Sequence, residues 1–422
     1  MQLEQQQQYE TFKRIQGVKS VYGRLVQQIK EDDALRREFL TVVKEDLYAF
    51  SPHFYVSARI CYSNKSYLDI LNEIKSADAY KNRVAKFVLN LLEKGHMSIF
   101  GTQYRVVSLY IYPNYYKLLR DYIASELSKI VVLEPYGGNL LVNTRFNMEL
   151  LRYYLQSVDA KEKEDLLSEL AEVIGQRKET LYVYRDKPIF YDDLYLMLEG
   201  KTSKDLSANE KKYFNFLKEL EKLHEVPVAK FGQVTLLIIK LPEELITVSA
   251  SGRNPLLRTI GPDYYNFWFV IETTRNSATQ ILRHIMLNFT QRSNRYTKVS
   301  LADYRLSYRT IAKGLDIWKA ASAKDRKAKT LEWLELFVNR AKEDINFYNW
   351  LLNNGFKKED ARDEIFQRQA TTLNAAGLGM FWREFLNLRL AKEAQWYTRA
   401  VANAIFELLE DAVSAKGGDN ND

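Results

Sequence analysis

The residues best suited to chemistry lie in one stretch in the second half of the chain, from Thr273 to Lys298. A helix is predicted at its start by apolar residues three or four apart, at Ala278, Ile281, Leu282 and Ile285. The polar residues of the stretch include Gln280, Arg283, Asn288, Ser293, Arg295 and Tyr296. Arginine forks and a serine hydroxyl on one connected element suit a phosphate and a planar acceptor such as a pyrimidine. A solvated basic helix end is the alternative interpretation of the same spacing.

The composition narrows the class of protein. A chain of 422 residues suits two domains or one duplicated architecture, and 46% apolar residues provide a sizeable core. The single cysteine, Cys61, excludes an intramolecular disulfide and a thiolate metal cluster, and we expect no metal site from four scattered histidines. The net charge of +7 favours anionic ligands, and either nucleotides or a nucleic acid would satisfy it.

The hydropathy pattern predicts a cytoplasmic protein. No apolar run approaches the roughly 18 residues that a transmembrane helix needs, so we expect no contact with a membrane. The first ten residues are polar and lack the apolar centre of a signal peptide.

Periodicity and breakers predict the elements that position these residues. Helices are expected at 9–48, ended by Pro52, and at 79–94, 115–127, 143–155, 319–352, 358–369 and 380–409. Strands are expected at 104–112, 234–239 and 265–271. The charged region 158–230 is expected to be mostly helical, with a turn at Lys187–Pro188.

The central stretch resembles the signature of the flavin-dependent thymidylate synthases, the ThyX family. That signature reads Arg-His-Arg, seven residues, Ser, one residue, Arg. Arg283-His284 and Ser293-x-Arg295 match it, Gln280 fits three residues upstream, and Ile285 stands at the third signature position.

Two later blocks resemble the same family. One is Gly355 followed by Glu359-Asp360-Ala361-Arg362, and the other is Phe385–Arg389 followed by Ala394-Gln395-Trp396. The resemblance implies that six residues bind or orient dUMP: Gln280, Arg283, Ser293, Arg295, Arg362 and Arg389. Of these, Arg389 is expected to polarise the base and Ser293 to hydrogen-bond the nucleotide, and we place both in the catalytic set. Ser293 is not assigned as a nucleophile, because no base partner is evident.

The flavin-contact positions of the family are altered in the second half. Leu378 and Met380 stand where the family has an Asn-x-Arg pair, and Arg258 and Ile260 stand where it has Gly-His-x-Ser/Thr. Gln291 replaces the usual glutamate. A leucine or methionine cannot hydrogen-bond a ribityl or phosphate group.

The first half carries the missing motifs. Gly95-His96-Met97-Ser98 precedes a predicted strand, Asn143-Thr144-Arg145 matches the Asn-x-Arg pair, and Ala58–Tyr62 resembles an early family block. The first half lacks the nucleotide set in turn, with Asp121-Tyr122-Ile123 at the Arg-His-Arg position and Tyr154 at the last arginine. The alternative is that Gly95–Ser98 is only a helix C-cap with an exposed histidine, and that Asn143 is only an N-cap.

Because each half lacks the motifs that the other keeps, we expect a fused tandem duplication. In it the first half contacts the flavin and the second half contacts the nucleotide. The expected fold class is α+β, with two ThyX-like modules, each a small sheet packed with helices, related by pseudo-twofold symmetry. The expected ranges are an N-terminal module with a helical extension at 1–157, a helical connector at 158–230, a C-terminal module at 231–412 and a disordered tail at 413–422. Since ThyX proteins are homotetramers of single modules with sites between subunits, a fused pair is expected to form a homodimer.

The resemblance implies a thymidylate synthase reaction. A one-carbon unit passes from methylenetetrahydrofolate to C5 of dUMP, with reduced FAD as hydride source and NADPH as reductant. The residues expected to contact FAD are His96, Ser98, Asn143, Arg145 and His284. Two alternatives stay open: a diverged relative that binds a pyrimidine nucleotide, or less favourably a nucleic acid, without turnover, and an enzyme that modifies C5 of another uridine-bearing substrate.

Overall fold

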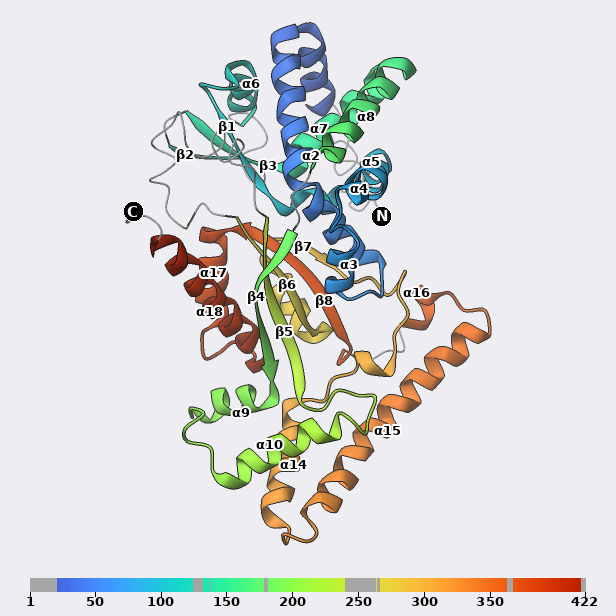
Figure 1. Cartoon of the computed structure of the whole chain (residues 1–422), viewed down its shortest axis with the longest axis vertical. Coiled ribbons are helices and arrows are strands. Elements are labelled where there is room, and N and C mark those ends of the chain that lie inside the picture. The colour runs from blue at the N-terminus through green and yellow to red at the C-terminus, as the bar shows by residue number, and fades with distance from the viewer. Residues whose placement is uncertain are drawn as a thin grey trace, which may run out of the picture. The chain divides into compact units, whose positions relative to one another are not determined.

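The computed structural model describes residues 21–123, 132–136, 138–177, 181–239, 263, 266–362 and 367–418 (Figure 1). The chain divides into two compact units, and neither is continuous in sequence. The first unit comprises Met1–Ser57, Leu71–Leu181 and Ile239–Gly261, and the second comprises Ala58–Ile70, Tyr182–Ile238 and Pro262–Asp422. These units divide the predicted 158–230 connector between them and assign residues 58–70 to the second unit.

The first unit combines helices with a small antiparallel sheet. The sheet has the strand order β1-β3-β2, from β1 (Tyr104–Ser108), β2 (Val132–Tyr136) and β3 (Asn139–Asn143). Its helical elements are 21–31, α2 (Asp33–Tyr62, which ends in the second unit), α4 (Ala77–Ala79), the π-helix η1 (Tyr80–Val84), α5 (Ala85–Glu93), the 3₁₀ helix η2 (Met97–Thr102), α6 (Pro113–Ile123), α7 (Thr144–Ser157) and α8 (Ala160–Gly175). Helix α3 (Tyr67–Asn72) begins in the second unit and ends in the first. The α5 helix ends before Gly95, whose φ of 78° is accessible to glycine, so the predicted C-cap is confirmed.

The prediction that Pro52 ends the first long helix was wrong. The helix breaks at Asp32, whose carboxylate accepts hydrogen bonds from the amides of Ala34 and Leu35 at 2.8 and 3.0 Å, and α2 then runs through Pro52. Proline has no N–H, so the Tyr48 carbonyl one turn earlier loses its helical donor. The buried Arg177 guanidinium donates to that carbonyl and, at 2.9 Å, to the next one at Ala49.

The second unit is built on a sheet of five strands in the order β4-β5-β6-β8-β7. They are β4 (Leu181–Phe190), β5 (Lys230–Ile239), β6 (Asn266–Thr274), β7 (Asn288–Gln291) and β8 (Ala370–Leu378). The β6 and β8 strands pair antiparallel along their whole length, and every residue of β8 is buried. The helices are α9 (Tyr191–Glu199), α10 (Ala208–Leu220), α13 (Arg275–Ile281), α14 (Tyr308–Ala320), α15 (Arg326–Asn353), α16 (Lys358–Ala361), α17 (Gly379–Arg389) and α18 (Trp396–Gly418), and η5 (Leu301–Asp303) is a 3₁₀ turn.

Several predicted boundaries in this unit were wrong. The expected turn at Lys187–Pro188 lies inside β4, where proline is tolerated because β4 is an edge strand of the sheet. The expected helix 358–369 is only α16, and the buried strand β8 after it was not predicted. The predicted helix 319–352 begins inside α14 and is interrupted at 321–325 before α15, and the helix 380–409 is split into α17 and α18. The α18 helix continues to Gly418, so the tail predicted from 413 is helical to that residue, and 419–422 lie outside the described residues.

The two sheets share one pairing pattern. In the first unit β3 pairs with β1 on one side and β2 on the other, and in the second unit β8 pairs with β6 and β7. Asn143 ends β3, pairs with the first residue of β1 and is the N-cap of α7. Leu378 ends β8, pairs with the first residue of β6 and is the N-cap of α17. Asn143 and Leu378, matched by sequence alone, therefore occupy equivalent positions within their own sheets.

Candidate nucleotide and flavin sites

The signature stretch folds as a short helix, a turn, a strand and a loop. Thr274 ends β6 and caps α13, its hydroxyl accepting from the Ser277 amide at 3.3 Å. The helix ends at Ile281, and the chain turns so that β7 can pair with β8. The predicted helical apolar face was therefore wrong at Ile285, whose side chain is 91% exposed in this turn.

Arg389, the last residue of α17, gathers three of the predicted residues around it. Its Nε donates to Nε2 of His284 at 2.8 Å, and its Nη2 donates to the backbone carbonyl of Gln280 at 2.8 Å. Burial and the nearby Arg283 charge lower the pKa of Arg389. We call Gln280, Arg283, His284 and Arg389 the Arg389 cluster. It concentrates positive charge and guanidinium donors at the C-terminal end of α13.

His284 is held in its neutral form within this cluster. Its Nε2 accepts a hydrogen bond, and its ring lies edge-on to Phe385 at 4.8 Å between centroids. Burial and the adjacent Arg389 charge lower the pKa of His284 to about 4. His284 can therefore orient Arg389 but is not a cation at neutral pH.

We expect His284 to make the protein less stable in mild acid. The folded-state pKa lies near 4, below the roughly 6.5 of an unfolded histidine, so its stabilising contribution is present above pH 6.5. It is lost as the pH falls toward 4, because the unfolded chain takes up the proton first. Glutamine can accept the hydrogen bond from Arg389 without titrating. Between pH 7 and 4.5 the melting temperature should therefore fall further for the wild type than for His284→Gln. Equal losses would contradict this assignment.

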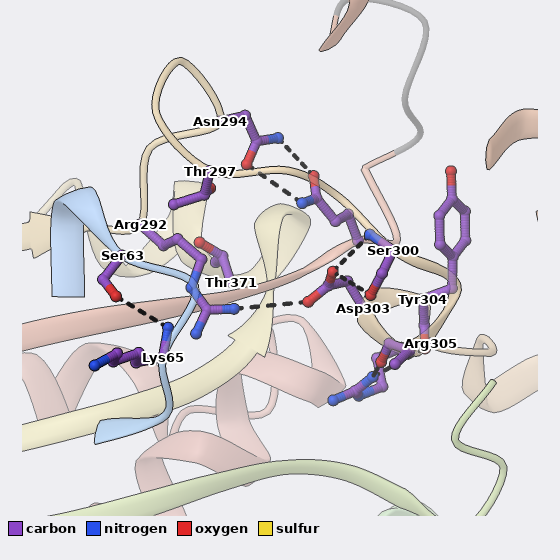
Figure 2. Close-up of polar contacts among 12 residues, drawn as sticks. Ser63, Lys65, Arg292, Asn294, Thr297, Ser300, Asp303, Tyr304, Arg305 and Thr371 are labelled. Carbon is purple, nitrogen blue, oxygen red and sulfur yellow. Dashed lines mark hydrogen bonds and ion pairs between the residues drawn. The ribbon is translucent and has the colours of Figure 1, made fainter. Parts of the chain in front are cut away.

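The loop after β7 carries Ser293 and Arg295 and is fixed from α13. Arg275, the first residue of α13, donates from Nη2 to the Arg292 carbonyl at 3.1 Å and to Oδ1 of Asn294 at 2.6 Å. Its Nε donates to the Gln369 side chain at 3.1 Å. Figure 2 shows Asn294 on this loop, and it shows Arg292 directed at Asp303, 3.6 Å away. Arg275 therefore connects α13, the loop and the segment before β8.

This loop lies in a positively charged environment. Burial lowers the pKa of Arg275, the charges of Arg362 and Arg292 lower it further, and the Asp303 carboxylate acts in the opposite direction. Arg362 is half-buried just after α16, and Arg295 is exposed. Such an excess of arginine suits an anionic ligand. Arg275 was missed from the sequence, although its place between a strand and a helix next to the signature was a usable signal.

The α13 helix sets the spacing between these two groups. Arg275 and Gln280 are five residues apart on it, which corresponds to about 7.5 Å of helical rise. The Arg389 cluster thus lies at one end of α13 and the Ser293 loop is anchored at the other. This separation is on the scale of a mononucleotide with its base at one end and its phosphate at the other.

The predicted flavin contacts of the first half lie in the first unit. Their side chains differ in exposure and in the bonds that they already make. Asn143 is buried and serves as an N-cap, with Oδ1 accepting from the Arg145 amide at 2.9 Å and Nδ2 donating to the Gly101 carbonyl at 3.1 Å. Ser98 is exposed, and His96 is half-buried at the start of η2. Arg145 is 51% exposed and pairs with Glu149 at 3.0 Å.

The donor set fits a flavin nucleotide only in part. An exposed hydroxyl, an imidazole and a guanidinium, from Ser98, His96 and Arg145, are suitable contacts for ribityl and phosphate oxygens. The Asn143 side chain is already used within the fold, as its N-cap interpretation predicted. In the second half Leu378 is fully buried and Met380 half-buried, and Arg258 and Ile260 lie outside the described residues.

A segment from the first half contributes to the second unit at the loop. The Ser293 amide donates to the Cys61 carbonyl at 3.0 Å, and the rings of Tyr62 and Tyr296 meet edge-on at 4.9 Å. The Cys61 thiol interacts with the Thr290 side chain and the Gln291 backbone, and burial raises its pKa to about 11. The early block Ala58–Tyr62, found by resemblance, thus lies beside the predicted nucleotide residues.

We expect Cys61 to be unreactive in the folded protein. At pH 8 a thiol with a pKa near 11 is almost entirely protonated, and the thiolate is the reactive species. Alkylation by iodoacetamide, followed by mass spectrometry, should be at least tenfold slower than for the same chain in denaturant. Equal rates would show that the thiol is accessible and ionised.

Comparison with known proteins agrees with the arrangement in the second unit. Residues 263–413 match the family model of the thymidylate synthase complementing proteins. The flavin-dependent thymidylate synthase of Saccharolobus solfataricus is 31% identical over 144 residues, which cover 33% of this chain and 46% of that enzyme. Residues 263–413 are therefore similar to the ThyX family, and the structure, with small sheets packed among helices, is consistent with the α+β fold of that family.

Three further findings concern the length matched, possible metal ligands and membrane-spanning helices. The chain spans about half the length of the relative that it matches. Within the described residues, no group of His, Cys, Asp and Glu is arranged to hold a metal ion. Among the same residues, no helix is long and apolar enough to cross a membrane.

Proposed function

We propose that the protein is a flavin- and folate-dependent enzyme of the thymidylate synthase type that transfers a one-carbon unit from methylenetetrahydrofolate to C5 of dUMP. The observation that carries the proposal is the Arg389 cluster, in which residues from two family blocks meet inside the family-matched region. A flavin would supply the hydride, and NADPH would reduce it.

The residues of the second unit would bind and polarise the nucleotide. Arg389 and Arg283 would stabilise negative charge that develops on pyrimidine oxygens when the ring is activated. His284, neutral and bonded to Arg389, would fix the direction of that guanidinium and contact the flavin. Ser293, Arg295 and Arg362 would hold the phosphate or base from the other end of α13, and Gln280 would complete the set.

We further propose that the first half holds the FAD and descends from the same module as the second. The matching β1-β3-β2 and β6-β8-β7 pairing, with Asn143 and Leu378 at equivalent caps, supports a tandem duplication. Ser98, His96 and Arg145 would then be the flavin contacts. Two such chains would supply four modules as a homodimer, and we expect the enzyme in the cytoplasm.

The FAD content of the purified protein tests whether the first half binds the flavin while the second half binds dUMP. The purified protein, reconstituted with FAD, should approach one FAD per chain by absorbance at saturation. Arg145→Ala should lower this content and spare dUMP binding, whereas Arg120→Ala, an exposed arginine of α6 in the same unit, should lower neither. Unchanged flavin content in Arg145→Ala would leave the first half as a structural remnant.

A second candidate function rests on Ile285. This side chain stands at the third signature position and is 91% exposed, and it cannot donate a hydrogen bond to a cofactor. A relative that binds a pyrimidine nucleotide or nucleic acid without turnover, or that modifies another uridine, would tolerate it. A colourless protein that binds dUMP but cannot be reconstituted with FAD would favour the binding protein.

A further inference from the structure

We propose that Tyr62 is a positioning residue for the Ser293 loop, so that the first half of the chain helps to build the nucleotide site of the second. This deepens the proposed function, on which its nucleotide-binding part rests. It differs from the simpler hypothesis that the first half contributes only contacts to the flavin.

The loop is a tight turn whose Asn294 side chain is held by Arg275 and Gln369. The amides of Tyr296 and Thr297 both donate to the Ser293 carbonyl at 3.1 Å, and the Thr297 hydroxyl donates to the same oxygen at 3.0 Å. These bonds fix the turn internally but do not place it against the rest of the unit. The placement has to come from groups outside the turn.

Segment 58–66 supplies contacts of that kind. The Cys61 carbonyl accepts from the Ser293 amide at 3.0 Å, and the Tyr62 ring meets the Tyr296 ring at 79° and 4.9 Å, the edge-on geometry favoured by aromatic pairs. Figure 2 draws Ser63 and Lys65 of this segment together with Arg292 and Asn294 of the loop. The segment therefore holds both ends of the Ser293–Tyr296 turn.

The opposite side of the turn is held from the helix that leads to Arg362. Lys358 of α16 donates from Nζ to the Tyr296 carbonyl at 3.0 Å. Tyr296 is thus bound through its backbone to the Arg362 side and through its ring to Tyr62. Since Arg295 lies between Ser293 and Tyr296, its backbone position depends on both anchors and on the bond from Arg275 to Asn294.

The role is positional and not chemical. The Cys61 thiol is protonated at neutral pH, so it does not act as a nucleophile. Tyr62 is half-buried and acts on the loop through its ring, so phenylalanine should preserve the contact and alanine should remove it. The ligand affected would be the anionic pyrimidine nucleotide that Ser293 and Arg295 are proposed to bind.

Hydrogen exchange and calorimetry on the full chain test this proposal. Tyr62→Ala should speed exchange of the Ser293 amide and weaken dUMP binding by about three- to tenfold, the worth of one aromatic pair. Tyr62→Phe should behave as wild type in both measurements. Tyr184→Ala, which removes an exposed tyrosine from β4 of the same unit, should change neither. Melting temperatures establish that each variant is folded.

The outcomes separate this proposal from the proposed function. Ser293 exchange that is unchanged in Tyr62→Ala, or equal effects of Tyr62→Phe and Tyr62→Ala, would overturn the positioning role. Faster exchange in Tyr62→Ala alone, with no dUMP binding by the wild type, would support the positioning role and reject the nucleotide. Should Tyr62→Ala fail to fold, Tyr296→Ala, compared with Tyr296→Phe, tests the same ring pair from the loop side.

Discussion

Replacing Arg389 with alanine is expected to weaken dUMP binding by roughly 10- to 150-fold, the equivalent of about 1.5–3 kcal/mol for hydrogen bonds to a charged group. The variant removes the guanidinium that is proposed to face the pyrimidine. It also frees His284 and the Gln280 carbonyl, to which Arg389 donates. Arg389→Lys should be intermediate, because lysine keeps the charge but lacks the planar fork. Isothermal titration calorimetry measures all three proteins.

A matched control is present on the same helix. Arg383 of α17 is 64% exposed and pairs with Asp263 at 2.9 Å, so Arg383→Ala removes an arginine that is outside the cluster. It should bind dUMP as the wild type does. Unchanged affinity in both Arg389→Ala and Arg362→Ala would remove these residues from the site.

Replacing Arg177 with methionine is expected to lower the free energy of unfolding by about 2–5 kcal/mol. Arg177 donates to the carbonyls of Tyr48 and Ala49, and its guanidinium lies over the Tyr48 ring at 5.7 Å. Methionine fills much of the volume but leaves those carbonyls without this donor. Urea unfolding measures the loss.

Replacing Pro52 tests more directly whether Arg177 substitutes for the missing backbone donor. In a Pro52→Ala background, the new amide can donate to the Tyr48 carbonyl, so loss of Arg177 should cost about 1 kcal/mol less. The four proteins form a double-mutant cycle. Strictly additive effects would show that Arg177 does not substitute for the missing helical donor.

The candidate site was more predictable from the sequence than the elements that carry it. Arginine, histidine and glutamine at family spacing identified the members of the Arg389 cluster, because side-chain chemistry is visible in the sequence. The helix predicted to carry them was too long, because pairing of β7 with β8, 80 or more residues apart, ends it early. The apolar spacing through Ile285 could not reveal that competition.

Other misses have the same non-local cause. Pro52 is a reliable helix breaker until a distant guanidinium replaces its missing donor, and Arg177 lies 125 residues further along the chain. Strand β8 is buried throughout, and its only β-branched residues are Thr371 and Thr372, so it shows no polar–apolar alternation and few of the residues that favour strands. Its place between β6 and β7 is set by the partners and not by its own residues.

Release of tritium from [5-³H]dUMP tests the central claim most directly, because the C5–H bond must break when a carbon unit is transferred to C5. The assay contains the full chain, FAD, NADPH and methylenetetrahydrofolate. The account predicts release that requires both FAD and the folate, that is reduced at least tenfold in Arg389→Ala, and that is retained in Arg383→Ala. Release that is absent from a folded protein shown by calorimetry to bind dUMP would contradict the enzyme and leave a nucleotide-binding protein.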